Sequence, residues 1–522
     1  MPPAPNEHGS LNFTQFFWLL LAASVVAMAG RYIRIPYALA LVVTGLLIGA
    51  PHLLPQAHLD PHLLFTVFLP PLLFETAINI RFDALRREWK PVAIYALGGT
   101  FLSTFLIAWL SAQWLGLPLT VALVFGALIS STDPVSVIAV FKQLGVGKRL
   151  SLLMEAESLF NDGAAVVLFG VLTGAAMGQS VSLAAGIQTF LTTVLGGAGV
   201  GILLGGLASR LTREFNEHLL EITLTTIVAF GSYLLAETLH VSGVIAVVSA
   251  GLVIGNYGMR TGMSPATRLA VVSFWEYAGF VVNSIVFLLL GIEVTFVNLW
   301  KDAPIIGGAV CIVLLARAAV VYLLSIGVNA LKGNVPLAYQ HILFWGGLRG
   351  ALSMALVLGL PPSFPQRDTL VALAFGVVLF SLLAQGLTMG PLIRRLGLSG
   401  SATREAGYAR LVGQRLAYQA ALHELERLHA EGFVSRAVAE SLQQEYRAHI
   451  DRLEAEVDAL HLSDEALAER QRMEARRLMR LAEKNALLDA LHNGILDEED
   501  FRALTEQIDE ELNILREARS TH

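Results

Sequence analysis

The chain has 522 residues, of which 55% are hydrophobic and only 15% are charged, and its formal net charge is −6. A soluble globular protein carries roughly 25% charged residues, so the composition excludes an ordinary soluble protein and indicates a membrane protein. The negative net charge argues against nucleic acid as a partner. Cys311 is the only cysteine, which excludes an intrachain disulfide and a cysteine-rich metal site.

Apolar runs long enough to cross a bilayer alternate with short polar loops from about residue 12 to residue 396. A helical span needs about 20 apolar residues, and the sequence predicts about thirteen spans. They are 12–29, 33–50, 61–79, 91–113, 118–141, 152–177, 185–209, 218–237, 241–257, 272–296, 304–330, 340–360 and 369–393. The predicted fold is therefore an all-α polytopic membrane protein.

Two of the predicted spans contain residues that break a helix. Pro134 in the fifth span removes a backbone donor, and the glycine-rich stretch "GGLRGA" at 346–351 loosens the twelfth. If the seventh span is a linker, each break falls in the fifth span of a six-span half. This order is typical of inverted repeats that build a midplane site from discontinuous helices.

Ionisable residues inside the sixth span mark a candidate site, because a carboxylate in hydrocarbon costs on the order of 3 kcal/mol. Asp162, Ser158 and Glu155 share one stripe of the helix, and Glu157 and Asn161 share the neighbouring stripe. Interhelical hydrogen bonding alone would also explain such a polar patch. We interpret it as a face toward a cavity, with Asp162 at its centre.

The two broken spans add further polar groups to this patch. Thr132 and Asp133 stand at the first break, where Asp133 can cap the second half-helix and favour its dipole. Arg349 stands in the second break and needs a carboxylate or backbone carbonyls as partners. Glu157 is the predicted partner of Arg349.

Five sequence segments, in this order, resemble the sodium/proton exchanger branch of the cation:proton antiporters. They are "FLPPLLFE" at 68–75, "TDPVSV" at 132–137, "ESLFNDG" at 157–163, "GGLRGA" at 346–351 and "AQGLTMGPL" at 384–392. The resemblance covers about residues 12–396. It implies a thirteen-span fold with a dimerisation domain and a moving core domain, assembled as a homodimer.

The resemblance also implies a role for each motif residue. Asp162 is expected to be the carboxylate that binds the transported Na⁺ or the proton. The other expected roles are Thr132, Ser158 and Asn161 in forming or holding the site, Asp133 at the broken crossing, Glu75 approaching the site through water, and Glu157 with Arg349 as a structural ion pair.

The chemistry expected at Asp162 is competition between a cation and a proton. Na⁺ is a hard cation that prefers oxygen ligands, and removal of a carboxylate from water favours its protonated form. Asn161 cannot titrate, so one proton is expected to exchange for one monovalent cation, Na⁺ or Li⁺, without net charge movement. No cofactor is expected, and a secondary active transporter rather than an enzyme is predicted.

Two alternatives were weighed against this interpretation. A K⁺/H⁺ antiporter could use a nearly identical site, so the sequence does not fix the cation, the pH optimum or the direction of transport. An intramembrane aspartyl protease would need Asp133 and Asp162 to face one water molecule. Asp133 precedes Pro134 at a helix break, and Asp162 follows Asn161 where the usual motif has glycine, which disfavours the protease.

The last part of the chain differs from the rest in composition. We predict a transmembrane antiporter domain at 1–398 and a helical tail at 399–522, whose Leu-, Glu- and Arg-rich pattern is compatible with two helical hairpins. The tail could aid dimerisation or regulate transport. Arg394 and Arg395 after the last span favour a cytoplasmic tail, and an odd number of spans then places the N-terminus outside the cell membrane.

Overall fold

The computed structural model describes residues 13–29, 37–49, 61–178, 182–212, 217–293, 302–331, 333–431 and 433–463, with scattered residues between 472 and 508. The chain divides into two compact units. One comprises Met1–Leu331 and Val335–Ser399, and the other comprises Lys332–Asn334 and Gly400–His522. Every regular element in the described residues is a helix, so the predicted all-helical fold is confirmed.

The first unit contains ten described helical segments that are long and apolar enough to cross a membrane. Five of them are uninterrupted helices: α10 (Lys148–Ala176), α11 (Leu183–Leu211), α12 (His218–Thr238), α15 (Pro265–Glu293) and α17 (Ala303–Ala330). Two shorter apolar helices precede them, α1 (Phe13–Ala29) and α2 (Tyr37–Gly49). The unit is therefore a multi-pass membrane domain.

Four further spans contain one π-helical turn each. They are α3 (Pro61–Leu63) with η1 (Leu64–Phe68) and α4 (Leu69–Asn79); α6 (Trp89–Ala93) with η2 (Ile94–Gly98) and α7 (Gly99–Trp114); α13 (Gly243–Val253) with η3 (Ile254–Gly258) and α14 (Met259–Thr261); and α20 (Arg367–Phe380) with η4 (Ser381–Gln385) and α21 (Gly386–Arg395). Such turns insert one residue without breaking the helix and are frequent at functional sites.

Two spans are broken in the middle and unwound there. The first is α8 (Leu119–Ser130) followed by α9 (Val135–Leu144), and the second is α18 (Leu337–Trp345) followed by α19 (Ala351–Leu358). Both breaks fall where the proline and glycine pattern predicts them. A short helix, α5 (Phe82–Arg87), connects α4 to α6.

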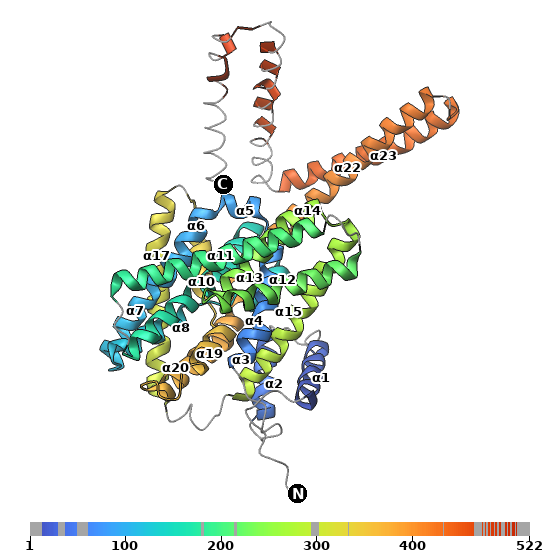
Figure 1. Ribbon diagram of the computed structural model, residues 1–522. Helices are drawn as coiled ribbons and strands as arrows, with labels where there is room; N and C mark the ends of the chain where they lie inside the picture. The colour runs from blue at the N-terminus through green and yellow to red at the C-terminus, as the bar shows by residue number, and fades with distance from the viewer. Residues whose placement is uncertain are drawn as a thin grey trace. The chain divides into compact units, whose positions relative to one another are not determined.

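The helices of the membrane unit pack in two groups (Figure 1). The first group contains both broken spans and is called the crossing group here. In it, α8 packs against α7 and α10, and α17 packs against α7 and α20. In the second group, α13 packs against α4, α11 and α12, and α15 packs against α2 and α4. Close approach of α2 and α15 needs glycine, because a Cβ on Gly45 would lie 2.2 Å from the carbonyl oxygen of Leu288.

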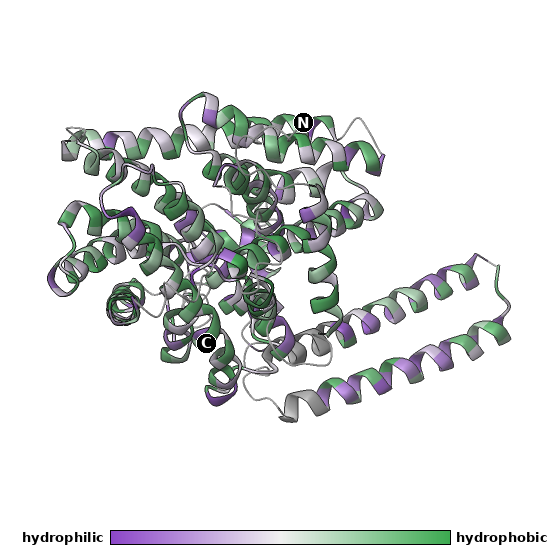
Figure 2. Cartoon of the chain, turned by 90° about the horizontal axis from the view of Figure 1, so that it is seen from below, coloured by the Kyte–Doolittle hydropathy of each residue, from purple (hydrophilic) through white to green (hydrophobic). Residues whose placement is uncertain are grey.

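The helices of this unit consist largely of hydrophobic residues (Figure 2). Large hydrophobic side chains are exposed on several helices, among them Leu195 and Leu203 on α11 and Leu323 and Ile326 on α17. Such side chains suit the hydrocarbon core of a bilayer, which offers no hydrogen-bond partners to polar groups. Glu157, Arg317 and Arg349, by contrast, are buried in the interior.

Predicted and observed spans agree in place within a few residues for most helices. The largest difference is α15, which begins at Pro265 instead of residue 272. Its first turns carry Thr267 and Arg268, so hydrophobicity alone does not reveal where the helix starts. The total of thirteen spans and the inverted repeats remain predictions.

The second unit contains the helical hairpin of α22 (Ser401–Ala430) and α23 (Arg436–Ser463), which pack against each other. Tyr418 of α22 stacks on His449 of α23, with ring centroids 5.3 Å apart. On the α22 surface, hydrogen bonds from the Arg427 guanidinium lower the pKa of the Glu424 carboxyl. The second expected hairpin lies largely outside the described residues.

Candidate functional site

The first helix break lies around Pro134, and a carboxylate caps the helix that follows. α8 ends at Ser130, residues 131–134 lie outside both helices, and α9 begins at Val135. Oδ1 of Asp133 accepts a hydrogen bond of 2.9 Å from the backbone N–H of Val135. Asp133 stands just before Pro134, the N-cap residue of α9, and satisfies the first backbone N–H of that helix. Its negative charge faces the positive end of the helix dipole.

The second break crosses the first. Residues 346–350 separate α18 from α19, and the backbone N–H of Asp133 donates a hydrogen bond of 2.8 Å to the carbonyl of Leu348. The segments are so close that a Cβ on Gly350 would lie 2.2 Å from Oδ2 of Asp133. Four helix ends therefore meet inside the membrane unit, where their unpaired backbone groups need partners.

Arg349 supplies partners for the end of α8. Its side chain is buried, and its Nη1 donates hydrogen bonds of 2.8 Å to the carbonyl oxygens of both Ser130 and Ser131. These carbonyls form the negative end of the α8 dipole, so the guanidinium neutralises it. The backbone N–H of Arg349 also donates to Oγ of Ser381 at 3.1 Å, which ties the break to η4.

The predicted ion pair between Glu157 and Arg349 is wrong. Glu157 is bound by Arg317 of α17, with Nη1–Oε1 at 2.8 Å and Nη2–Oε2 at 3.1 Å. Nη2 of Arg317 also donates to the carbonyl of Leu343 at 2.9 Å. Arg349 instead binds the two carbonyl groups that the helix break leaves unpaired. The carboxylate of Glu157 therefore pairs with Arg317. The only sequence signal for Arg317 was an arginine within an otherwise apolar span.

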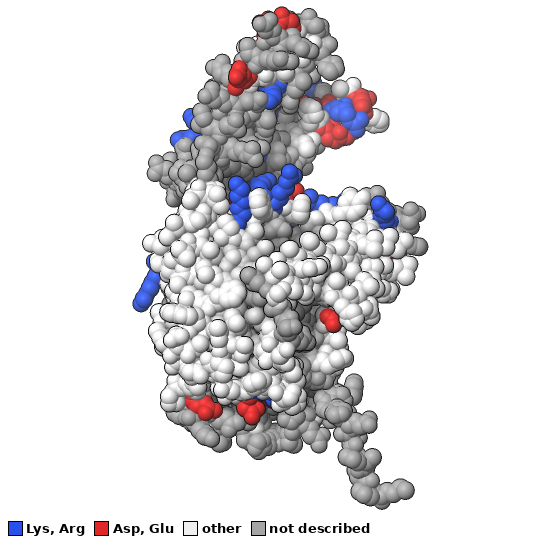
Figure 3. Space-filling model, turned by 60° about the vertical axis from the view of Figure 1, so that its left-hand side comes forward, with Lys and Arg blue, Asp and Glu red and all other residues white. Residues whose placement is uncertain are grey.

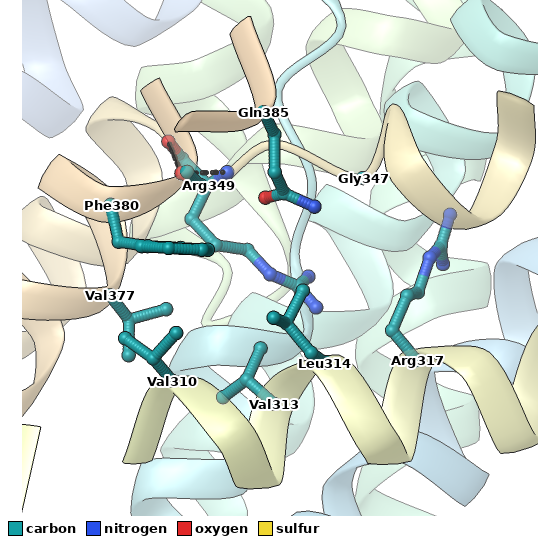
Figure 4. A pocket seen from close by; sticks show the side chains of 10 residues that line it. Val310, Val313, Leu314, Arg317, Gly347, Arg349, Val377, Phe380 and Gln385 are labelled. Carbon is teal, nitrogen blue, oxygen red and sulfur yellow. Dashed lines mark hydrogen bonds between the residues drawn. The ribbon is translucent and has the colours of Figure 1, made fainter. Parts of the chain in front are cut away.

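A small cavity of about 10 Å³ lies beside the two arginines (Figure 4). Arg317, Arg349 and Gln385 line it, together with apolar side chains of α17 and α20. Nε of each arginine is buried without a hydrogen-bond partner among the described residues. The volume suits a single water molecule, and the unpaired donors give such a molecule polar partners.

Thr132 in the first break is held by two residues of α10. Nδ2 of Asn161 donates to Oγ1 of Thr132 at 2.7 Å, and the backbone N–H of Thr132 donates to Oδ1 of Asn161 at 3.2 Å. The hydroxyl of Ser158 donates to the carbonyl oxygen of Thr132. The predicted grouping of Thr132, Ser158 and Asn161 is present in the structure. Both ends of the Asn161 amide are used within it, whereas Oγ of Ser158 keeps its lone pairs.

Asp162 follows Asn161 on α10 and is half-buried. Its Oδ1 is fully buried and has no hydrogen-bond partner among the described residues. The Ser131 side chain lies beside this carboxylate, and the negative charges of Asp133 and Glu157 act on it. An unpaired buried oxygen is costly, and nearby negative charge adds to the cost. The arrangement therefore favours a proton or a cation at Asp162.

Three further carboxylates, Glu75, Glu155 and Glu276, form a second group. Glu75 on α4 and Glu155 on α10 are half-buried and act on each other electrostatically, and Lys142 of α9 acts on both. Glu276 of α15 also acts on Glu75. This group joins α9 and α10 to α4 and α15, the two helix groups of the fold. The approach of Glu75 to Asp162 remains a prediction.

Comparison with known proteins agrees with this geometry. The profile of the family described as "Sodium/hydrogen exchanger, transmembrane" matches residues 19–395. The chain is 39% identical over 461 residues to the Na(+)/H(+) antiporter NhaG of Bacillus atrophaeus, covering 85% of this chain and 86% of that protein. It is 40% identical over 439 residues to the low-affinity Na(+)/H(+) antiporter NhaS1 of Synechocystis, covering 82% and 83%.

A solved structure has the same fold. The sodium proton antiporter MjNhaP1 from Methanocaldococcus jannaschii superposes with a TM-score of 0.62 and covers 73% of this chain and 98% of its own. Sequence identity to it is 23%, so the likeness concerns the fold. The family profile match lies within the membrane unit.

Proposed function

Since this chain belongs to the sodium/hydrogen exchanger family, we propose that it is an electroneutral antiporter that exchanges one Na⁺ or Li⁺ for one proton at Asp162. The observation that carries the proposal is the half-buried Asp162, whose Oδ1 has no partner among the described residues beside two crossed helix breaks. Such a transporter moves ions without covalent chemistry, so it is not an enzyme. The names of its relatives support sodium as the cation.

Exchange follows from competition for one carboxylate. Both a proton and a cation neutralise Asp162, and binding of one removes the charge that attracts the other. Oγ of Ser158 and the carbonyl oxygen of Thr132, to which this hydroxyl donates, are the further oxygen ligands within the same neighbourhood. A hard monovalent cation prefers such oxygen donors. When the site faces each side of the membrane in turn, competition becomes antiport.

Asn161 is a positioning residue in this proposal. Its amide is bound at both ends to Thr132, so it holds the unwound segment against α10 rather than binding the ion. The cation site is therefore built from residues that α10 and the first break present together.

The one-to-one stoichiometry rests on Asn161 and Glu157. Asn161 carries no titratable proton. Glu157 is buried, and both of its oxygens accept hydrogen bonds from Arg317, so its carboxylate is engaged in this pair. Asp162 is then the titrating carboxylate of the site. One proton for one monovalent cation moves no net charge, so the membrane potential does not drive the exchange.

Alternating access is proposed as a movement between the two helix groups. The crossing group carries Asp162 and both breaks, and Arg349 with Asp133 neutralises the helix ends within it. These contacts let the crossing move as one body. Glu75 belongs to the second helix group and Glu155 to the crossing group. The distance between these two carboxylates therefore changes as the helix groups move.

The assembly and topology are also proposals. We propose a homodimer in the cell membrane with the N-terminus outside and the tail in the cytoplasm. The loop charges at Arg394 and Arg395 support this orientation. The domains proposed are 1–398 for transport and 399–522 for the tail, and the α22–α23 hairpin gives the tail a compact start.

The test is a proteoliposome assay of the full chain with an imposed pH gradient and one cation at a time. The proposal expects Na⁺, and also Li⁺, to dissipate the gradient. Exchange with K⁺ alone would show a K⁺/H⁺ antiporter instead. Dissipation of the pH gradient without any added cation would overturn the proposal of antiport. So would the absence of exchange with Na⁺, Li⁺ and K⁺ alike.

A further inference from the structure

The segment of residues 80–90, called the connector here, runs from the end of α4 to the first two residues of α6. It has the composition of a segment that lies at a membrane surface. Its short helix α5 turns Leu85 inward, where this side chain is buried. Phe82 and Trp89 are instead 53% and 57% exposed. Exposed aromatic side chains at the ends of spans are typical of the headgroup level of a bilayer.

The structure holds the connector firmly in place. Oδ1 of Asn256 accepts a hydrogen bond of 2.6 Å from the backbone N–H of Phe82, and Nδ2 of Asn256 donates one of 2.8 Å to the carbonyl of Ile80. Asp83 forms an ion pair with Arg260 of α14 at 3.0 Å. These contacts fix the first half of the connector to the second helix group.

The other end of the connector is fixed to the crossing group. Glu88 accepts two hydrogen bonds from Arg149 of α10, at 2.8 and 3.0 Å. The connector therefore bridges the two groups that are proposed to move during transport. Its exposed side chains keep a defined position relative to the ends of the spans.

The charges of the connector are unbalanced. Its acidic residues, Asp83 and Glu88, each have an arginine from another helix. Arg81, Arg86, Arg87 and Lys90 are exposed, and none has an ion-pair partner among the described residues. Figure 3 shows Lys and Arg side chains gathered at the end of the membrane unit where α5 and α6 lie in Figure 1.

We propose that the connector is a binding site for the headgroups of anionic phospholipids, with Arg86, Arg87 and Lys90 binding the phosphate and Phe82 and Trp89 set at the acyl boundary. Charge complementarity and the exposed aromatic pair together favour a lipid, because a soluble anion would leave the aromatic side chains in water. This inference is independent of the ion site.

The experiment measures binding of phosphatidylglycerol to the full-length protein by native mass spectrometry, with phosphatidylcholine as the neutral lipid. Each basic residue near an anionic surface contributes about fivefold in affinity. The variant Arg86→Gln/Arg87→Gln/Lys90→Gln should therefore bind phosphatidylglycerol about a hundredfold more weakly. The matched control, Arg410→Gln/Arg436→Gln/Arg447→Gln, changes the same charge on the tail hairpin and should bind as the parent does.

The outcomes separate the proposal from its rivals. A selective loss in the connector variant, with an unchanged melting temperature in detergent, supports it. Equal loss in both triple variants would overturn it, since net charge would then decide binding. Binding that arises only after removal of residues 400–522 would also overturn it, because the tail would be the occupant. If the triple variant does not fold, the single changes Arg86→Gln and Arg87→Gln must each weaken binding about fivefold, or the proposal fails.

Discussion

Removing one partner of the buried Glu157–Arg317 pair should strongly destabilise the membrane unit. The side chains are 2% and 6% exposed, and two hydrogen bonds of 2.8 and 3.1 Å join them. Glu157→Gln leaves a buried guanidinium without its carboxylate, which costs about 3–5 kcal/mol. Arg317→Met leaves a buried carboxylate and should cost a similar amount.

The double variant distinguishes a pair from two independent residues. With both charges gone, neither partner is left unpaired, so the combined loss should be about 2–3 kcal/mol smaller than the sum of the single losses. The matched control combines Glu157→Gln with Arg349→Met, because Arg349 binds backbone carbonyls instead. This second cycle should be much closer to additive.

The assay is the free energy of unfolding of the detergent-solubilised protein in a denaturant titration. The three single variants, Glu157→Gln, Arg317→Met and Arg349→Met, and the two double variants are measured under the same conditions. Additive losses for Glu157 and Arg317 would refute the pairing. A larger coupling between Glu157 and Arg349 than between Glu157 and Arg317 would restore the prediction made from the sequence.

Three further predictions concern the crossing, the tail and the stoichiometry. Gly350→Ala should cost about 1–3 kcal/mol of unfolding free energy, because its Cβ would lie 2.2 Å from Asp133. Gly170→Ala, where a Cβ would meet nothing within 4 Å, should not destabilise, and equal losses would contradict the close crossing. A chain ending at Ser399 should still exchange ions in proteoliposomes, and a folded truncate without transport would place the tail in the mechanism. A potential clamped with valinomycin should neither drive nor stall Na⁺/H⁺ exchange, whereas a steady current proportional to Na⁺ turnover would show that a second charge moves.

The sequence predicted the parts of the fold that depend on local chemistry. Apolar length located the spans, Pro134 located the first break, and the glycines around Arg349 located the second. Proline and glycine act on their own backbone, so their effect is readable without the tertiary structure. The π-helical turns were not predicted, because these spans are almost uniformly apolar and an inserted residue has no clear periodic pattern to disturb.

The pairing of the buried charges could not be predicted in the same way. Glu157 had two candidate arginines in the later spans, and sequence spacing does not tell which one faces it. The answer depended on the carbonyls of Ser130 and Ser131, which become available to Arg349 only because α8 ends there. Helix α5 was not predicted, since a six-residue helix is too short for a periodic signal.

The exchange activity of Asp162→Asn tests the central claim most directly. The substitution removes the charge and keeps the size of the side chain, so the protein should fold and melt as the parent does. Proteoliposomes with an imposed pH gradient should show no Na⁺-dependent proton flux for this variant, while the parent dissipates the gradient. Near-normal Na⁺/H⁺ exchange by Asp162→Asn would contradict the account, because the cation and the proton would then compete at another group.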